Sequence, residues 1–319
     1  MWKTVLRRVL IMIPQLFILS IFVFVLAKFM PGDPFSGMIN PQTPPARLEE
    51  LREKAGLNDP IPTQYVRWLK NAAHGDFGKS YTMKMPVNRV IGERAQNTFW
   101  LALLSMILMY AIALPLGIIA GRKSGTKIDQ GINLYNFLTL SIPGFVMYLV
   151  SLLIFGYRLK WFPTGGTVSI SAGTGLSYIG SRLYHMLLPA LSYALIATTG
   201  TVQYLRNEII DAKTQDYVRT ARAKGVPTKK VYSHHIFRNS LLPIAAFFGF
   251  QITGLLGGSV MIETVFAYPG MGSLFIESIS SRDYSVITTL VLLYGLLTLM
   301  GSLLSDIIMT IVDPRIRID

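Results

Sequence analysis

The sequence of 319 residues has no cysteine, only four histidines and few charged residues for its length. The missing cysteine excludes disulfides, thiolate metal sites and cysteine nucleophiles, and it is compatible with any compartment. Charged residues make up 15% of the chain, whereas a typical soluble domain has about a quarter. Hydrophobic residues make up 51%, and the charges are confined to a few blocks. The long uncharged stretches between these blocks predict a membrane protein.

The ionisable side chains show no catalytic pattern. The adjacent His234 and His235 point in different directions on a helix, so we interpret them as basic loop residues rather than metal ligands. The spacing of the remaining residues supports neither a nucleophilic triad nor a pair of carboxylates in one cleft. We therefore predict a protein that is not an enzyme and that has no catalytic residues, no metal site and no cofactor.

One segment resembles part of a phosphate-binding loop. Residues 75–80 read Gly-Asp-Phe-Gly-Lys-Ser. The full pattern needs a glycine five positions before the Gly-Lys pair, and that position is Ala73. We interpret the segment as a loop without a nucleotide.

Six segments are apolar and long enough to cross a bilayer, which takes about 20 mainly apolar residues. We therefore expect an all-α polytopic membrane protein with six transmembrane helices. The first segment is too long for a signal peptide and has no small-x-small cleavage site, so we interpret it as a retained helix. The six segments cover residues 9–30, 98–120, 134–157, 186–205, 241–266 and 286–312.

The net charge of +13 suggests nucleic-acid binding at first, but membrane proteins collect Lys and Arg in their cytoplasmic loops. With six spans, both termini lie on one side of the membrane. The loops and ends on that side carry sixteen basic and six acidic residues, and the opposite side is less basic. We therefore predict cytoplasmic termini and no nucleic-acid partner.

The expected organisation follows from these spans. The external segment contains two candidate short helices, at 46–55 and at 64–73, and the second is amphipathic. The expected parts are 1–30 (cytoplasmic N-terminus and helix 1), 31–97 (external segment), 98–312 (transmembrane domain with helices 2–6 and a long cytoplasmic loop at 206–240) and 313–319 (cytoplasmic tail).

Two carboxylates, Glu263 and Asp306, lie within or near apolar spans. A charge at membrane depth is costly and is often functional. Both residues lie close to the ends of their spans, so we favour a position at the membrane interface over a role in proton coupling. The spans also contain prolines that favour kinks, at positions 14, 115, 143 and 189.

The cytoplasmic segment 208–243 is much longer than a simple connection between two spans requires. Good helix formers lead to Gly225, which is a typical helix C-terminus. The pattern predicts a short helix, a glycine turn and a second helix, which together form a projecting elbow. A basic patch on anionic lipid is one role for it, and docking of a cytoplasmic partner is the role that the ordered turn favours.

This elbow resembles the EAA loop in the permease subunits of binding-protein-dependent ABC importers, where a glycine is followed downstream by Leu-Pro. Here these residues are Gly225 and 242–243, and Arg-Thr-Ala at 219–221 replaces the name-giving Glu-Ala-Ala. The run at 217–225 is usual in the dipeptide, oligopeptide and nickel branch. Other matching segments are 31–34, 59–60, 64–65, 68–69, 75–80, 263–266, 268–272, 282–284 and 313–315.

The resemblance implies a type I ABC importer permease in a bacterial cell membrane. Its partners are expected to be a second homologous permease, two cytoplasmic ABC ATPases that hydrolyse ATP, an external solute-binding lipoprotein and the lipid bilayer. The elbow is expected to be the coupling helix, seated in an ATPase groove. The implied coupling residues are Tyr217, Arg219, Thr220, Ala221, Ala223, Lys224, Gly225 and Pro227.

The resemblance implies a peptide substrate, and nickel or glutathione remain alternatives within the branch. No residue is assigned to substrate contact. A gradient-driven transporter or channel is a different class, which predicts charges at the membrane midplane and independence of ATPases. A receptor or anchor without transport is a third hypothesis, and it does not require six spans with internal prolines.

Overall fold

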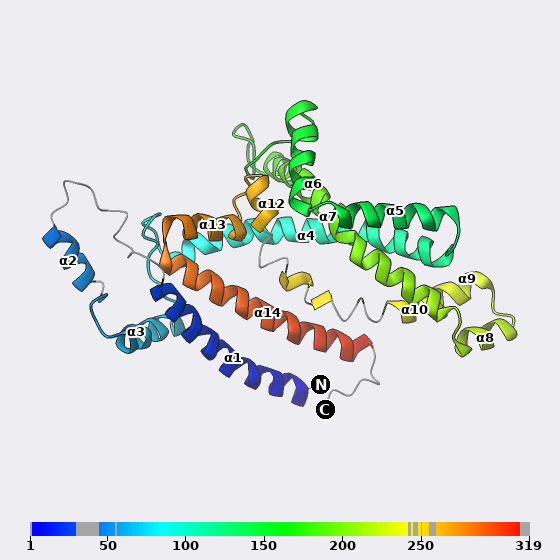
Figure 1. Cartoon of the computed structure of the whole chain (residues 1–319), viewed down its shortest axis with the longest axis horizontal. Coiled ribbons are helices and arrows are strands. Elements are labelled where there is room, and N and C mark those ends of the chain that lie inside the picture. Colours follow the sequence, from blue (N-terminus) through cyan, green and yellow to red (C-terminus); the bar gives the residue numbers. More distant parts are fainter. Residues whose placement is uncertain are drawn as a thin grey trace.

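The computed structural model describes residues 2–29, 45–54, 56–241, 244, 248–249, 251–254 and 260–312. Secondary structure in these residues is helical, apart from one isolated bridge between Lys79 and Pro86. Four long helices dominate the fold (Figure 1). They are α1 (Trp2–Phe29), α4 (Val87–Arg122), α7 (Leu176–Ala212) and α14 (Tyr284–Val312).

The four long helices are each long and apolar enough to cross a membrane. Large apolar side chains of α1 lie on its surface, and Ile18 is 66% exposed. A continuous exposed apolar face of this kind suits a lipid environment. The chain is therefore a multi-pass membrane protein, as its composition predicts.

The third expected span is a broken helix. It consists of α5 (Lys127–Ser141), then α6 (Gly144–Ser151) continued by the π-helix η2 (Leu152–Arg158), and the two parts are bent by 98°. The break contains Pro143, which has no N–H to continue the helix, and the preceding Ile142 is extended at φ −103° and ψ 125°. Counting this pair as one span, the described residues contain up to five candidate spans.

The fifth expected span, at 241–266, lies partly outside the described residues. The described parts near it include α10 (Phe237–Ser240) and α12 (Val260–Val265). The expected turn at 31–34, the Leu-Pro pair at 242–243 and the tail at 313–319 lie outside the described residues.

Helices α4 and α7 pack closely along their length, and α1 packs against α14. Small residues allow the close approach of α4 and α7. A Cβ atom added at Gly117 would lie 3.0 Å from the Cβ atom of Leu205, and one added at Gly121 would lie 2.7 Å from that of Ile209. These distances are too short for larger side chains, so the two glycines fix the spacing of the pair.

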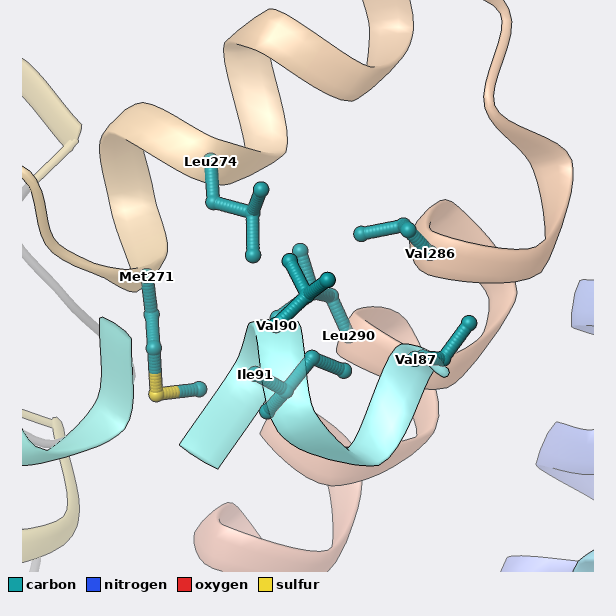
Figure 2. Packing of buried hydrophobic residues seen from close by; sticks show 7 residues of the cluster. All are labelled: Val87, Val90, Ile91, Met271, Leu274, Val286 and Leu290. Carbon is teal, nitrogen blue, oxygen red and sulfur yellow. The ribbon is translucent and has the colours of Figure 1, made fainter. Parts of the chain in front are cut away.

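A second packing centre joins α4, α13 (Met271–Ser281) and α14. Figure 2 shows side chains from all three helices pointing into one cluster. Leu274 and Leu290 are completely buried there. The buried members are Val87, Val90, Ile91, Met271, Leu274, Val286 and Leu290.

Two short helices follow α1, namely α2 (Pro45–Lys54) and α3 (Ile61–Ala73). They confirm the helices that the sequence predicts at 46–55 and 64–73. Helix α3 begins earlier than predicted, because a proline is favoured in the first turn of a helix. The Tyr65 and Trp68 rings of α3 pack on Phe24 of α1, with ring centroids 5.4 and 5.7 Å apart. The apolar face of the amphipathic helix α3 thus packs against α1.

Candidate functional site

The elbow begins with the short helix α8 (Asp216–Ala223), which follows α7 after a three-residue turn. Asp216 lies in the first turn of α8 and Arg222 in the last turn. Each charge opposes the partial charge of the helix end that it occupies, which favours a helix here. The sequence prediction of a short helix before Gly225 is confirmed.

A Schellman turn ends α8. The Gly225 N–H donates to the Arg222 carbonyl at 2.9 Å, and the Val226 N–H donates to the Ala221 carbonyl at 3.1 Å. Gly225 has a φ of +71°, a conformation that glycine adopts without the steric cost of a side chain. No heavy atom lies within 4 Å of a Cβ atom built at Gly225. Glycine is therefore required here by backbone geometry and not by crowding within the chain.

The chain returns from this turn through α9 (Thr228–Lys230), the π-helix η3 (Val231–Ile236) and α10. Pro227 precedes α9 and fixes the backbone where this arm begins. His234 and His235 lie within η3, so they belong to a helical arm and not to a loop. Figure 1 shows the elbow projecting beyond the end of α7.

One face of α8 is buried against the rest of the elbow and against α7. Val218 is completely buried and Ala221 is 6% exposed. They belong to one apolar cluster with residues of α7 and η3, so the elbow is firmly seated on α7. Its buried members are Leu205, Ile209, Ala212, Val218, Ala221, Val231 and Ile236.

The other face of α8 is exposed and basic. Of the eight predicted coupling residues, Ala221 lies in the apolar cluster, and the other seven lie on the exposed surface. The Arg219 side chain is 74% exposed and lies 3.7 Å from the carboxylate of Asp216. An exposed pair of this kind adds little stability, so these charges remain available to a partner. The exposed coupling residues are Tyr217, Arg219, Thr220, Ala223, Lys224, Gly225 and Pro227.

Lys213 lies between α7 and α8 and ties the elbow base to α4. Its Nζ donates to the backbone carbonyls of Gly121 and Arg122 at the C-terminal end of α4. A cation is favoured at this end of a helix. Partial burial lowers the pKa of the Lys213 ammonium from its ordinary value.

A second polar centre lies at the other end of α4, around the carboxylate of Glu263 in α12. Glu263 is completely buried. It accepts a hydrogen bond from the Thr98 hydroxyl at 2.8 Å, and from the backbone N–H groups of Gly272 and Ser273 at 2.7 and 3.0 Å. The carboxylate thus caps the N-terminus of α13 and joins α4, α12 and α13.

The surroundings of Glu263 leave no room for larger residues at two glycines. A Cβ atom at Gly270 would lie 2.4 Å from the Glu263 carboxylate, and one at Gly272 would lie 2.8 Å from the Cα atom of Val260. These contacts explain why both positions are glycine. The sequence placed Glu263 near the end of a span, but gave no sign that the carboxylate is enclosed by its own protein.

Next to this centre, Asn97 links three segments. Its amide nitrogen donates to the Pro269 carbonyl at 2.8 Å, and its amide oxygen accepts from Arg182 at 3.0 Å. The Tyr268 hydroxyl donates to the Asn97 carbonyl at 3.3 Å. The N-terminal thirds of α4 and α7 are thereby connected to the turn before α13.

A third contact joins the loop at 75–80 to the segment at 282–284. The Ser80 hydroxyl donates to the Asp283 carboxylate at 2.5 Å, and the Thr82 N–H donates to the same oxygen at 3.2 Å. Burial and the neighbouring Asp283 raise the pKa of the Tyr81 phenol from its ordinary value. The loop that resembles part of a phosphate site is therefore held by a carboxylate.

The other intramembrane candidate, Asp306 in α14, pairs with Arg8 of α1. The Arg8 Nε atom lies 2.8 Å from the Asp306 carboxylate. The two side chains are 41% and 20% exposed, so Asp306 is a partly exposed link between neighbouring helices.

Comparison with known proteins agrees with this geometry. The family described as "Binding-protein-dependent transport system inner membrane component" matches residues 113–318, and its N-terminal companion matches residues 1–102. The chain belongs to this family. The resemblance to the permease subunits of binding-protein-dependent ABC importers is thus confirmed for this permease.

Curated relatives cover nearly all of the permease. The oligopeptide transport system permease protein AppB of Bacillus subtilis is 41% identical over 314 residues, which is 98% of each chain. A putative peptide transport system permease protein of Brucella abortus is 35% identical over 319 residues and covers all of both chains. A probable peptide ABC transporter permease protein of Sinorhizobium fredii is 32% identical over 313 residues, or 98% of each chain.

Solved structures with a similar fold include an inward-facing conformation of the methionine ABC transporter MetNI. That chain aligns with a TM-score of 0.56 and 15% identity, and the alignment covers 70% of the permease and 96% of the MetNI chain. At this identity the comparison shows a shared fold. The all-helical ABC importer permease architecture is therefore supported independently of the sequence motifs.

Proposed function

We propose that this chain is the membrane-spanning permease subunit of an ATP-driven peptide importer. In this proposal it forms half of the translocation pathway, beside a second homologous permease. Two cytoplasmic ABC ATPases hydrolyse the ATP, and an external solute-binding lipoprotein delivers the peptide. The relatives in Bacillus, Brucella and Sinorhizobium are all named for peptides or oligopeptides, which favours this substrate over nickel or glutathione.

The observation that carries the proposal is the elbow. Its buried face is anchored on α7, and its exposed face presents basic side chains such as Arg219 and Lys224 beside the ordered turn at Gly225. A rigid, charged projection of this kind is better suited to bind a partner protein than a flexible loop is. We assign its exposed residues to contact with an ATPase groove.

The orientation is part of the proposal. The elbow and both termini are assigned to the cytoplasm, and residues 31–97 to the outside of a bacterial cell membrane. In this arrangement α2 and α3 contribute to the surface that meets the binding protein. The transmembrane domain comprises residues 98–312, with the coupling loop at 206–240.

ATP favours one state of the permease only if the ATPases bind the elbow differently in the two states. Closure of the ATPases moves the elbows together, and this movement switches the pathway between inward and outward access. A shift from a mostly inward to a mostly outward population requires a difference of about 5.5 kcal/mol between the two states. The energy of ATP binding is the source of this difference.

The test is reconstitution of the permease in lipid vesicles with its partner permease, both ATPases and the loaded binding protein. We expect uptake of labelled peptide that requires ATP, the binding protein and an intact elbow. Peptide uptake without any ATPase, driven by a proton gradient alone, contradicts the proposal. Labelled nickel and labelled glutathione in the same vesicles distinguish the alternative substrates.

A further inference from the structure

A buried ion pair links α5 to α7 near the base of the elbow. Arg206 of α7 donates from Nε and from a terminal nitrogen to the two carboxylate oxygens of Asp129, at 2.6 and 2.8 Å. The Asp129 side chain is 3% exposed and that of Arg206 is 22% exposed. Two parallel hydrogen bonds of this kind fix the orientation as well as the distance of the two groups.

The remaining hydrogen-bonding capacity of Asp129 is also used. Its carboxylate accepts the Gly125 N–H at 2.8 Å and the Asn133 amide at 3.0 Å. Asp129 therefore holds the turn that leads into α5 and also links the first two turns of α5. Four donors around one carboxylate make a rigid joint.

Helix α5 depends on polar contacts because it buries little apolar surface. Its buried residues are Asp129, Asn136 and Thr139, and all three are polar. Large apolar side chains of α5 point outward, and Phe137 and Leu140 are 66% and 67% exposed. Further along α5, the Tyr135 hydroxyl bonds to the Leu195 carbonyl of α7. The ion pair is thus the joint of α5 that lies nearest to the elbow.

The same part of α7 carries the elbow. Leu205 and Ile209, on either side of Arg206 in sequence, lie in the apolar cluster that buries Val218 and Ala221 of α8. A few residues later, Lys213 holds the end of α4. One stretch of α7 is therefore in contact with the elbow, α4 and α5.

We propose that Asp129 and Arg206 are positioning residues that pass a displacement of the elbow to α5, and through α5 to the bent span that continues into α6. This inference rests on the proposed function. The apolar cluster makes α7 follow the elbow, and the bidentate pair makes α5 follow α7. Without the pair, the elbow and α7 still move, but the cytoplasmic end of α5 no longer follows them.

The functional test compares variants in the reconstituted importer. We expect Asp129→Asn to retain ATP hydrolysis by the assembled complex within about twofold, while peptide imported per ATP falls about tenfold, because one half of a buried pair is lost. Arg206→Lys keeps the charge but loses the bidentate geometry, so import per ATP falls less.

A matched control is Glu277→Gln. It neutralises the carboxylate of a more exposed pair, Arg94–Glu277, whose closest atoms lie 3.3 Å apart with side chains 23% and 49% exposed. We expect unchanged import per ATP for this variant, since exposed pairs contribute little. Unchanged import per ATP in both Asp129→Asn and Arg206→Lys overturns the inference.

The distance between α5 and the elbow, measured with and without ATP, distinguishes the proposed role of the ion pair from a role in stability alone. The sequence has no cysteine, so spin labels can be placed on cysteines introduced at the exposed Lys127 and at the exposed Lys230, which lies in the elbow but is not one of the coupling residues. We expect the distance between these labels to stay the same with and without ATP, because α5 and the elbow move together. In Arg206→Lys the distance is expected to differ between the two states.

Different results would contradict the proposed function and the proposed role of the ion pair. If the unmodified complex imports no peptide with ATP, the proposed function is wrong. If it imports normally but the distance between the labels changes with ATP in the unmodified protein, only the role of the ion pair is wrong. If Asp129→Asn does not assemble with the ATPases, Arg206→Lys alone tests the inference. The inference is then overturned if Arg206→Lys imports as much peptide per ATP as the unmodified complex and if its label distance is the same with and without ATP.

Discussion

Thr98 and Glu263 are joined by a hydrogen bond of 2.8 Å between a hydroxyl and a completely buried carboxylate, 165 positions apart in sequence. The same Thr98 oxygen accepts the Met271 N–H at 2.8 Å. Two side chains therefore hold the start of α13 against the start of the α4 span.

Replacement of Glu263 is expected to destabilise the permease. Glu263→Ala leaves the buried donors of Gly272 and Ser273 without their acceptor, at a cost of about 1–3 kcal/mol for each group. Glu263→Gln keeps one oxygen acceptor and is expected to cost less. Thermal unfolding in detergent measures both effects. Equal melting temperatures for Glu263→Ala and the unmodified protein contradict this role.

A matched test uses two glycines in different surroundings. We expect Gly270→Ala to lower the melting temperature, because the new Cβ atom would lie 2.4 Å from the Glu263 carboxylate. Gly200→Ala in α7 is the control, since nothing lies within 4 Å of its Cβ position. Alanine in a helix interior is about 0.5–1 kcal/mol more favourable than glycine, so the control is expected to unfold at the same or a higher temperature.

Gly225→Glu tests the elbow. We expect the variant to insert into the membrane and to lose peptide uptake, because a side chain at a φ of +71° costs roughly 1–2 kcal/mol and projects from the proposed docking surface. Uptake in reconstituted vesicles and copurification of the ATPases are the measurements. Normal uptake by this variant removes the coupling role of the turn.

The control for Gly225→Glu is Gly75→Glu. Gly75 has a φ of +77° and ends α3 with the same pair of backbone hydrogen bonds, both 2.9 Å long. The substitution repeats the backbone strain on the side assigned to the exterior. We expect a similar fall in melting temperature and full copurification of the ATPases.

Asp283→Ala is expected to loosen the loop that precedes α4. The substitution removes the acceptor of the Ser80 hydroxyl and of the Thr82 N–H. Hydrogen exchange of residues 75–86 is therefore expected to become faster, while exchange in α7 stays the same. Unchanged exchange in this loop is the result that contradicts the role of Asp283.

Features with a local cause were predictable from the sequence. The apolar runs predicted the long helices, and the charged and amphipathic patterns predicted α2 and α3. Good helix formers followed by Gly225 predicted the helix and turn of the elbow. These features depend on periodicity and on backbone preferences within a few residues.

Features that depend on distant contacts were not predictable in the same way. Pro143 indicated a kink in the third span, but not a bend of 98°. The sequence shows Glu263 as a charge near the end of a span. Its burial results from contacts with Thr98 and with the turn before α13, which are distant in sequence or depend on the fold. The pairing of Asp129 with Arg206 joins residues 77 positions apart, which the pattern of a single sequence does not reveal.

Helix α5 has the reverse of the pattern of a soluble helix: hydrogen-bonded polar groups such as Asp129 face the protein, and apolar groups such as Phe137 face outward. Such a helix is held most firmly where water is kept away from its inner side, because polar contacts weaken when water competes for them. We therefore expect the thickness and order of the surrounding acyl chains to change how tightly α5 is bound. We expect short-chain detergents, which admit water, to release this helix before any other long segment.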